Sequence, residues 1–445
     1  MIKAAFEEAH TAEWVEKNIG NPNHDLVILR HIIPWEKITG SLTQFYDKDR
    51  GAEGKELRTM VAVTVVSRFH QFSDREAVRQ VKENRYVQYF CNVADEELET
   101  FLHPSSLCVF RKRIGEKGAA VIEKEVFGML RRAGAVEGDC ALIDPTVLES
   151  SIIYPNDVQL IYKAFRKMRS SAGQHGIPLW WDDALLKKMW REFGLSKERD
   201  RLKWLAEFAV LFFAALETFG ILADSLNTSN KRKSKVLKLL RLLELLKEQT
   251  QQKLRGERHI KDRIVSLDDP DARPIKKGKS HPKCEFGTTV QMSFNRQGFM
   301  ITVENFIGNP NDKTLYPGTL NLFKERMGRL PDTVVTDLGI RSRSNIENTP
   351  GEVGNVFMGR STDVSEEKQD FCRSARSATE GFIAVAKNLR GFRKSLWHRL
   401  GGHRMWSLLC QTAYNLKKFL QLYYKEEIKE KSLVKLKLAW LYKTL

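Results

Sequence analysis

Two short apolar segments of the sequence are each followed by an aspartate. Residues 140–143 precede Asp144, and residues 333–336 precede Asp337, with Gly339 placed for a sharp turn after the second segment. Short apolar or β-branched runs of this kind predict buried strands, over residues 140–147 in the first case. Carboxylates at the ends of neighbouring strands lie close together and repel unless a cation lies between them. We therefore expect both aspartates at one cation site.

A third acid, Glu380, stands among basic and apolar residues in the segment RSARSATEGFIAVAKNLRGFRK. On a helix, Arg376, Glu380 and Lys387 would share one face. Hard divalent cations prefer carboxylate oxygens. Two such ions about 3.5–4 Å apart can activate a water molecule and stabilise the leaving oxygen of a phosphodiester. The sequence therefore predicts that Asp144, Asp337 and Glu380 bind two Mg²⁺ or Mn²⁺ ions and cleave phosphodiesters.

Each acid taken alone has a commoner explanation. An aspartate that follows a strand often caps a turn, and this applies to both Asp144 and Asp337. A glutamate such as Glu380, taken alone, is more often the surface ion-pair partner of a neighbouring cation, here Arg376. Spacing alone leaves these alternatives open.

The charge of the chain indicates a polyanionic partner. The 445 residues contain 73 Lys and Arg against 56 Asp and Glu, which gives a net charge of +17. Such a field attracts nucleic acid, although a basic enzyme of another kind or a ribosome-associated protein would share it. The six cysteines include no CxxC pair, which disfavours a zinc ribbon and suits a reducing cytosol.

The most apolar segment, residues 204–223, contains Glu207 and Glu217. Two acids inside such a run favour a buried helix over a membrane span, and the charged N-terminus does not resemble a signal peptide. We therefore expect a cytoplasmic protein with no membrane partner.

The first 135 residues have apolar residues at helical spacing and predict a small helical bundle. Ser73 precedes DREAVRQVKEN with a glutamate three residues on, which is the capping-box pattern. Ser105 or Ser106 could cap the next helix. That helix carries three candidate DNA-binding residues: Arg111, Lys112 and Arg113. A basic, solvated helix face is the alternative.

The other segments alternate between strand and helix. Residues 156–262 return to helical patterns, and TTVQMSFN and FMITVENFI, separated by RQG, predict a hairpin. A helix, the strand before Asp337 and one further strand follow. Residues 370–425 are helical and strongly basic, and contain three more candidate DNA-binding residues: Arg390, Arg393 and Lys394. The predicted fold is α/β, with a mixed sheet flanked by helices.

The segments that contain the three acids resemble a known family. ALIDPTVLESSIIYPNDVQLI, VTDLGIRSRSN and RSATEGFIAVAKNLRG resemble the three blocks of bacterial insertion-sequence transposases of the DDE type, which have an RNase H-like catalytic core. FSDREAVRQVKENRYVQYF and HPSSLCVFRKRIG resemble the helical domain that precedes this core, and FGTTVQMSFNRQGFMITVENFIGNPND is similar to the same family. The likeness covers roughly residues 30 to 420 in the same order.

The resemblance implies an all-α N-terminal domain over residues 1–135 and an RNase H-like domain over residues 136–425. A helical insertion at about 156–265 would interrupt the second domain, and residues 426–445 would form a basic tail.

The resemblance also implies the roles of particular residues. Asp144 matches the first metal-binding aspartate, on the first strand of the core, and Asp337 matches the second, on the fourth strand. Glu380 matches the glutamate of the late helix, and Arg376 and Lys387 match basic residues on either side of it. The chain departs from the family pattern at Arg373, where a tyrosine is usual, and at Ile340, where an aromatic residue is usual.

The activity implied by the resemblance is DNA transposition. Hydrolysis at the transposon end would free a 3′-hydroxyl that attacks target DNA, and the protein would act as a homodimer on paired inverted-repeat ends. The basic helix from Lys231 to Arg255 could lie along the DNA or pack as a scaffold. Two alternatives stay open: a nuclease of the same core without strand transfer, and a non-catalytic DNA-binding protein derived from a transposase.

Overall fold

The computed structural model describes residues 8–47, 54–175, 181–224, 226, 229–276, 284–359 and 365–425. Contacts divide the chain into two compact units. One comprises Met1–Leu148, Thr289–Phe306 and Pro310–Leu445, and the other comprises Glu149–Thr288 and Ile307–Asn309. The first is here called the sheet unit and the second the helical unit. The predicted tail, residues 426–445, lies outside the described residues.

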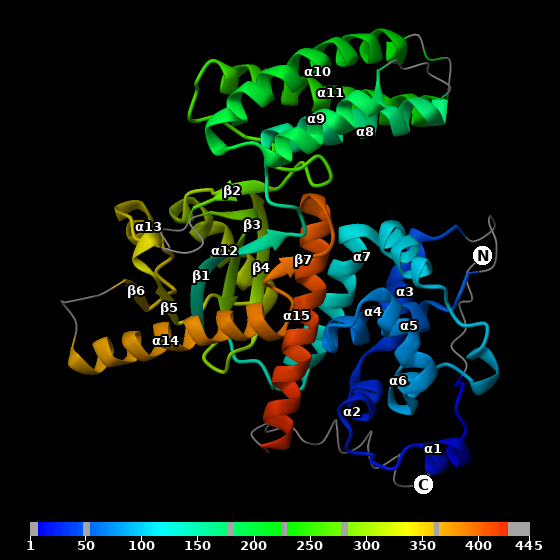
Figure 1. Ribbon diagram of the computed structural model, residues 1–445. Helices are drawn as coiled ribbons and strands as arrows, with labels where there is room; N and C mark the ends of the chain where they lie inside the picture. Colours follow the sequence, from blue (N-terminus) through cyan, green and yellow to red (C-terminus); the bar gives the residue numbers. More distant parts are fainter. Residues whose placement is uncertain are drawn as a thin grey trace. The chain divides into compact units, whose positions relative to one another are not determined.

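A mixed sheet with β1 near its centre confirms the predicted fold class (Figure 1). The strand order is β2-β3-β1-β5-β6, while β4 pairs with β3 and β7 pairs with β1. The strands are β1 Cys140–Ser150, β2 Arg273–Ile275, β3 Glu285–Phe294, β4 Met300–Ile307, β5 Thr333–Thr336, β6 Asn355–Met358 and β7 Lys394–Ser395.

The pairing directions match the sequence patterns. The hairpin predicted around RQG forms between β3 and β4, which are antiparallel. On the other side of β1, strands β5 and β6 run parallel. Parallel neighbours require crossover connections, and α12 (Asp312–Met327) lies between β4 and β5 in the chain.

The two faces of the sheet belong to separate hydrophobic cores. Ala141, Ile143 and Val334 lie in the core shared with the N-terminal helices. Leu142 and Val335 lie in the other core, together with residues of α14 (Glu366–Leu389) and α15 (Arg399–Tyr424). Successive side chains of a strand point to opposite faces, so this alternation fixes the face that each following residue uses.

Helices form the whole described N-terminal region, as predicted (Figure 1). They are α1 Ala12–Asn18, α2 Asp25–Ile32, α3 Trp35–Leu42, α4 Leu57–Phe69, α5 Asp74–Glu83, α6 Arg85–Cys91 and α7 Pro104–Arg132. Gly115 interrupts α7 with φ of 58°, a left-handed conformation that glycine adopts without strain.

One of the two predicted helix caps is confirmed and the other is wrong. Ser73 caps α5, since its hydroxyl oxygen accepts from the Glu76 backbone N–H at 3.2 Å. Helix α7 is capped by His103 instead of Ser105 or Ser106. The ring of His103 accepts from the backbone N–H of Ser105, and Pro104 occupies the first turn, where its missing N–H costs nothing.

Contacts group the N-terminal helices with the sheet in one compact unit, and the predicted domain boundary near residue 135 stays a prediction. Helix α15 packs against both α7 and α4. An ion pair of 2.8 Å joins Lys417 on α15 to Asp25 on α2, and another joins Arg326 on α12 to the buried Glu123 on α7. These long-range contacts merge the helices with the sheet.

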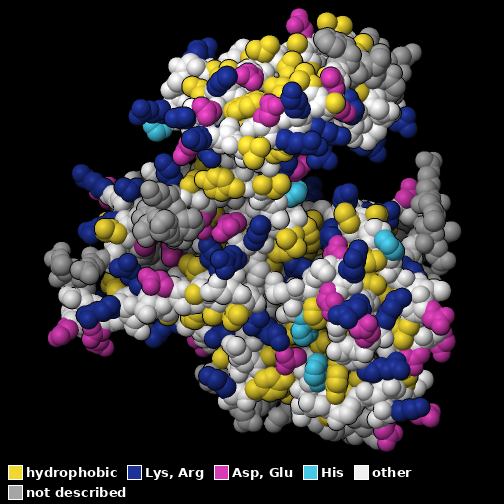
Figure 2. Space-filling model, in the orientation of Figure 1, with side chains coloured by type: hydrophobic (Ala, Val, Ile, Leu, Met, Phe, Trp, Pro, Cys, Tyr) yellow, Lys and Arg dark blue, Asp and Glu magenta, His cyan; other side chains and the backbone are white. Residues whose placement is uncertain are grey.

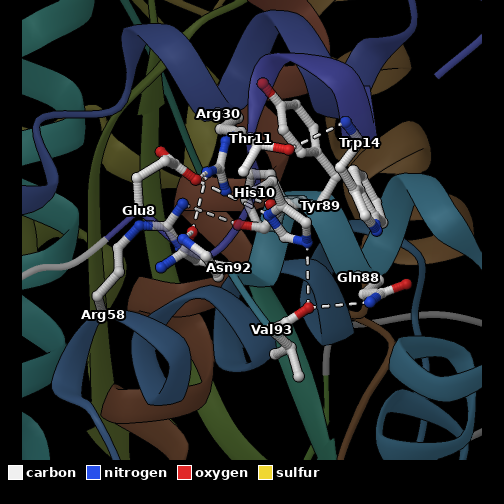
Figure 3. A network of polar contacts seen from close by, with 12 residues as sticks. Glu8, His10, Thr11, Trp14, Arg30, Arg58, Gln88, Tyr89, Asn92 and Val93 are labelled. Atoms are coloured by element: carbon white, nitrogen blue, oxygen red, sulfur yellow. Dashed lines mark hydrogen bonds and ion pairs between the residues drawn. The ribbon is translucent and has the colours of Figure 1, made fainter. Parts of the chain in front are cut away.

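A buried polar network anchors the N-terminal segment (Figure 3). The guanidinium of Arg30 donates to the Asn92 Oδ1 atom at 2.9 Å, to Glu8 and to the Tyr89 carbonyl oxygen, and lies 4.1 Å from the Tyr89 ring centroid. Burial acts to raise the pKa of Glu8, but the hydrogen bond with His10 and the charge of Arg30 outweigh it and lower that pKa.

Arg58 extends the same network. Its guanidinium donates to the Phe90 carbonyl oxygen at 2.8 Å and lies 3.5 Å from the Trp35 ring centroid. Burial lowers the pKa of Arg58 to about 9, so it still carries a charge at neutral pH. The network therefore joins α2, α4 and α6 through buried cations.

The helical unit contains the four long helices predicted for this block. They are α8 Asp157–His175, α9 Asp183–Leu195, α10 Arg201–Asp224 and α11 Asn230–Leu254. Phe208, Phe212 and Phe219 of α10 are fully buried. Among the described residues, the helical stretch Glu198–Ala223 alone is long and apolar enough to cross a membrane, and core helices meet the same criterion.

Candidate active site

Asp144 and Asp337 are neighbours in the sheet. The parallel register of β1 and β5 ends at the pair Ile143–Thr336, and the two aspartates are the next residue on each strand. Strands of one sheet lie about 4.8 Å apart, so the carboxylates leave the sheet side by side. The pairing that was expected from two strand ends is therefore present in the backbone.

Asp144 does not lie at the tip of the first strand as expected, because the strand extends to and beyond the end of the predicted range 140–147. Strand β1 continues through Pro145 to Ser150, and Thr146, Val147 and Leu148 are buried. The pairing with β5 stops at Ile143 because β5 itself ends at Thr336, while β1 continues. Asp144 thus lies within a long strand, beside the end of a short one.

Both aspartate side chains are directed to the face of the sheet that α14 covers. Leu142 and Val335, two residues earlier on the two strands, belong to the core on that face. Asp337 keeps an extended backbone, with φ of −75° and ψ of 174°, so the alternation holds through it. Asp144 and Asp337 are both half-buried.

The turn after β5 is built around the second carboxylate. The Asp337 Oδ1 atom accepts from the Ile340 backbone N–H at 3.3 Å, so the aspartate also caps this turn, as its alternative explanation required. A Cβ atom at Gly339 would lie 3.2 Å from the Asp337 Oδ2 atom. Glycine here lets the chain pass close to the carboxylate.

Helix α14 carries the third acid on the flank of its buried stripe. Cys372, Ala375, Thr379 and Ala386 are its buried residues, and Figure 1 shows the helix lying along the sheet. With 100° per residue, Arg376, Glu380 and Lys387 fall within one narrow sector beside that stripe. The prediction that they share a face is confirmed.

Glu380 is exposed and has no hydrogen-bond or ion-pair partner among the described residues. The alternative explanation, a surface ion pair with Arg376, is therefore not realised in this structure. A carboxylate that is left open on the helix over the aspartate face is available to bind a cation.

The three acids do not form a closed metal cluster. Over the described ranges of the chain, no group of three or more His, Cys, Asp and Glu side chains lies close enough to hold a metal ion. The register brings Asp144 and Asp337 together, while Glu380 stands apart on the exposed flank of α14. Two neighbouring carboxylates are hard oxygen donors and fit a divalent cation, so the donor chemistry suits the predicted ions.

Three basic residues lie along the segment from the end of α14 into β7, the short strand that pairs with β1. Burial lowers the pKa of Arg390, which is half-buried. Arg393 and Lys394 are exposed and have no ion-pair partner in the part of the chain that the structure describes. Because Lys394 lies in β7, which pairs with β1, these cations return to the strand that carries Asp144.

One predicted DNA-binding residue is engaged inside the protein. Arg111 is 8% exposed, donates two hydrogen bonds to Asp74, of 2.8 and 2.6 Å, and lies 4.7 Å from the Trp397 ring centroid. Its role is to join α7 to α5 and to the segment before α15. Lys112 and Arg113 are exposed and remain candidates.

Sequence reasoning missed the contact that seats α14. The hairpin turn places Gly298 at φ of 87°, and a Cβ atom there would lie 2.7 Å from the Phe382 Cε1 atom of α14. Phe382 also lies 5.6 Å from Phe294 between ring centroids. This turn therefore sets the position of the helix two residues beyond Glu380.

Comparison with known proteins identifies the family. A family model described as "Transposase domain (DUF772)" matches residues 14–113, a range that runs from α1 to the part of α7 just before Gly115. An uncharacterized protein of Rhizobium meliloti, ORF8 in the nfe locus, is 30% identical over 162 residues, which are 36% of this chain and 78% of that protein. No solved structure matches the chain. The chain belongs to a transposase family.

Proposed function

We propose that the chain is a DDE-type transposase. It would cleave phosphodiester bonds at transposon ends and join the freed 3′-hydroxyl to target DNA, with two Mg²⁺ or Mn²⁺ ions as cofactors. The observation that carries the proposal is the register of β1 and β5, which sets Asp144 beside Asp337 on the face covered by the helix of Glu380.

The proposed roles follow from the position of each side chain. Asp144 and Asp337 hold the cations at the sheet, and Glu380 completes the site from α14. When bound, the ions lower the pKa of the attacking oxygen and take up charge that develops on the phosphate. Arg376 and Lys387 lie beside Glu380 and bind the phosphates next to the cleaved bond. No serine, cysteine or histidine nucleophile is required.

The DNA-binding surface is proposed to include the half-buried Arg390 and the exposed cations of two other segments. Arg390, Arg393 and Lys394 connect α14 to the strand of Asp144, and Lys112 and Arg113 lie on the helix that the transposase model covers. Contacts of this kind are made mainly to phosphates and provide affinity that depends on salt. Action as a homodimer in the bacterial cytoplasm belongs to the same proposal.

A second candidate is a non-catalytic DNA-binding protein derived from a transposase. The observation that favours it is the separation of the acids, since the described residues contain no three-donor group for a metal. A third, a nuclease without strand transfer, shares the same carboxylates and differs only in the joining step.

A strand-transfer assay with labelled end DNA and Mg²⁺ separates the three. The transposase requires cleavage and joining that Asp144→Asn abolishes. The matched control is Asp332→Asn, because Asp332 is exposed near the opposite end of β5 and pairs with Arg329 at 3.0 Å. Cleavage without joining supports the nuclease. Binding without cleavage, unchanged by Asp144→Asn, supports the binding protein and rejects the proposal.

A further inference from the structure

Helix α11 of the helical unit begins with an unusual concentration of positive charge. Its first twelve residues contain six cations and no acid, and the first carboxylate of the helix is Glu244. The backbone dipole of a helix is positive at its N-terminus, so cations there are unfavourable for the isolated helix. A charge arrangement that does not stabilise the helix suggests an external partner.

The apolar stripe of α11 fixes which way these cations face. Val236, Leu240, Leu243 and Leu246 are buried in the core of the helical unit. Lys231, Lys235 and Lys238, at spacings of four and three residues, are all exposed and form one row to one side of this stripe. Arg232 and Arg241 flank this row, which is here called the lysine row.

The helical unit pairs many of its other cations but not these. Lys163 and Lys167 both pair with Asp268, at 3.3 and 2.8 Å, and Arg263 pairs with Asp157 at 2.6 Å. The three members of the lysine row have no ion-pair partner among the residues that the structure describes. Their charge is therefore not neutralised by neighbouring acids of the unit.

The lysine row is not part of a large basic patch on the visible surface, but it lies beside a recess. On the face shown in Figure 2, Lys and Arg side chains are dispersed among Asp and Glu side chains and form no continuous basic patch. Beside the lysine row, a recess of about 320 Å³ is lined by Asn230, Lys233, Ser234, Leu237, Lys238 and Arg241. The local excess of cations is thus accompanied by a concave surface.

We propose that the lysine row of α11 binds the phosphate backbone of double-stranded DNA without regard to sequence. This inference deepens the proposed function and rests on it. The row spans eight residues, or about 10 Å of helix, and one strand of a DNA duplex presents one phosphate per about 3.4 Å of the duplex axis. About three phosphates of one strand therefore match the three lysines. The apolar stripe of α11 is buried in the core of the helical unit, so it is not available to insert into a lipid bilayer.

The test is the salt dependence of binding. The full-length protein is titrated against a labelled 40-base-pair duplex of random sequence, without divalent ions, at several salt concentrations. Each phosphate contact contributes about 0.9 to the slope of log K against log salt. The Lys231→Gln/Lys235→Gln/Lys238→Gln variant should lower the slope by about 2.7, which is up to about 500-fold weaker binding at 0.1 M salt if the lines meet at 1 M. Glutamine keeps the helix propensity of lysine.

The control removes the same charge from ion-paired positions of the same unit. Arg199, Arg201 and Lys203 are exposed and pair with Asp200, Glu198 and Glu207. Their triple glutamine variant should leave the slope close to that of the unmodified protein.

Three results would overturn the inference about the lysine row. These are an unchanged slope in the α11 variant, an equal loss in both variants, or lysine-dependent binding to phosphatidylserine vesicles instead of DNA. If the unmodified protein does not bind DNA at all, the proposed function fails as well. The two claims also separate in the Asp144→Asn variant. If it loses cleavage but keeps the salt-dependence slope of DNA binding, catalysis depends on Asp144 and binding does not.

Discussion

Replacement of Gly298 by alanine should displace α14. Gly298 has φ of 87°, and a Cβ atom there would lie 2.7 Å from the Cε1 atom and 2.9 Å from the Cζ atom of Phe382. A left-handed backbone costs an L-residue about 1–2 kcal/mol, and overpacking adds about 1–3 kcal/mol. We expect Gly298→Ala to lower the free energy of unfolding by about 2–5 kcal/mol.

The matched control for the backbone cost is Gly134→Ala in the same unit. Gly134 has φ of 65°, but a Cβ atom there would meet nothing within 4 Å, so only the backbone cost of about 1–2 kcal/mol applies. Urea denaturation, followed by the midpoint at constant m-value, should place Gly298→Ala below Gly134→Ala by about 1–3 kcal/mol.

A second variant isolates the ring contact. Phe382→Leu removes the ring edge, so the double variant with Gly298→Ala should recover most of the steric cost, and the two changes should be coupled. Equal destabilisation by Gly298→Ala and Gly134→Ala, with no rescue by Phe382→Leu, would refute the inference that this turn seats α14. If Phe382→Leu does rescue Gly298→Ala, DNA cleavage by the single variant Gly298→Ala should also fall, because Phe382 lies two residues from Glu380.

Three further substitutions test the contacts that build the sheet unit. Burial acts to raise the pKa of Asp25, but its hydrogen bond and charge interaction with Lys417 outweigh it and lower the pKa. The pair therefore contributes stability above the pKa of an unfolded aspartate and loses it as the pH falls through the pKa of the folded state. Asp25→Asn should lower the free energy of unfolding by about 1–2 kcal/mol at pH 7 and flatten the acid side of a curve of stability against pH. An unaltered acid side would contradict this. Ser73→Ala removes the α5 cap and should lower the urea midpoint by an amount equivalent to about 1 kcal/mol, whereas no change would mean that water replaces the hydroxyl. Glu123→Gln leaves Arg326 without its carboxylate and should cost up to about 3–5 kcal/mol in the same urea experiment, and a cost below that of Ser73→Ala would argue against a buried ion pair.

The sequence was sufficient to predict the elements whose signals are local. The hairpin around RQG, the strand before Asp337 and the α5 cap at Ser73 each depend on a few adjacent residues. The apolar run over residues 204–223 was predicted to be a buried helix, and the structure shows a helix there whose Phe208, Phe212 and Phe219 lie in the core of the helical unit.

Predictions failed where the deciding contact is distant in the chain or where two local signals compete. The apolar run before Asp144 suggested that this residue lies at the tip of the strand, but buried residues after it continue β1 to Ser150. The sequence pattern predicted that Arg111 is a surface cation. Its partner Asp74 lies 37 residues earlier in the chain, and only the fold brings it to the guanidinium. The packing of α15, from the end of the described chain, against α7 was not predictable for the same reason.

The candidate site was predictable in part. Alternation along β1 and β5 places both aspartates on one face, and helical spacing places Glu380 between Arg376 and Lys387. The position of α14 over the sheet was not predictable, since it depends on the contact of Gly298 with Phe382 across the fold.

The central claim is that Asp144, Asp337 and Glu380 together bind divalent cations. The most direct measurement is an anomalous difference map from crystals of the protein soaked in Mn²⁺. The account predicts density between the Asp144 and Asp337 carboxylates, with Glu380 turned toward it, and loss of that density in Asp144→Asn crystals. Mn²⁺ density elsewhere, or none at these aspartates while other sites in the crystal are occupied, would contradict it.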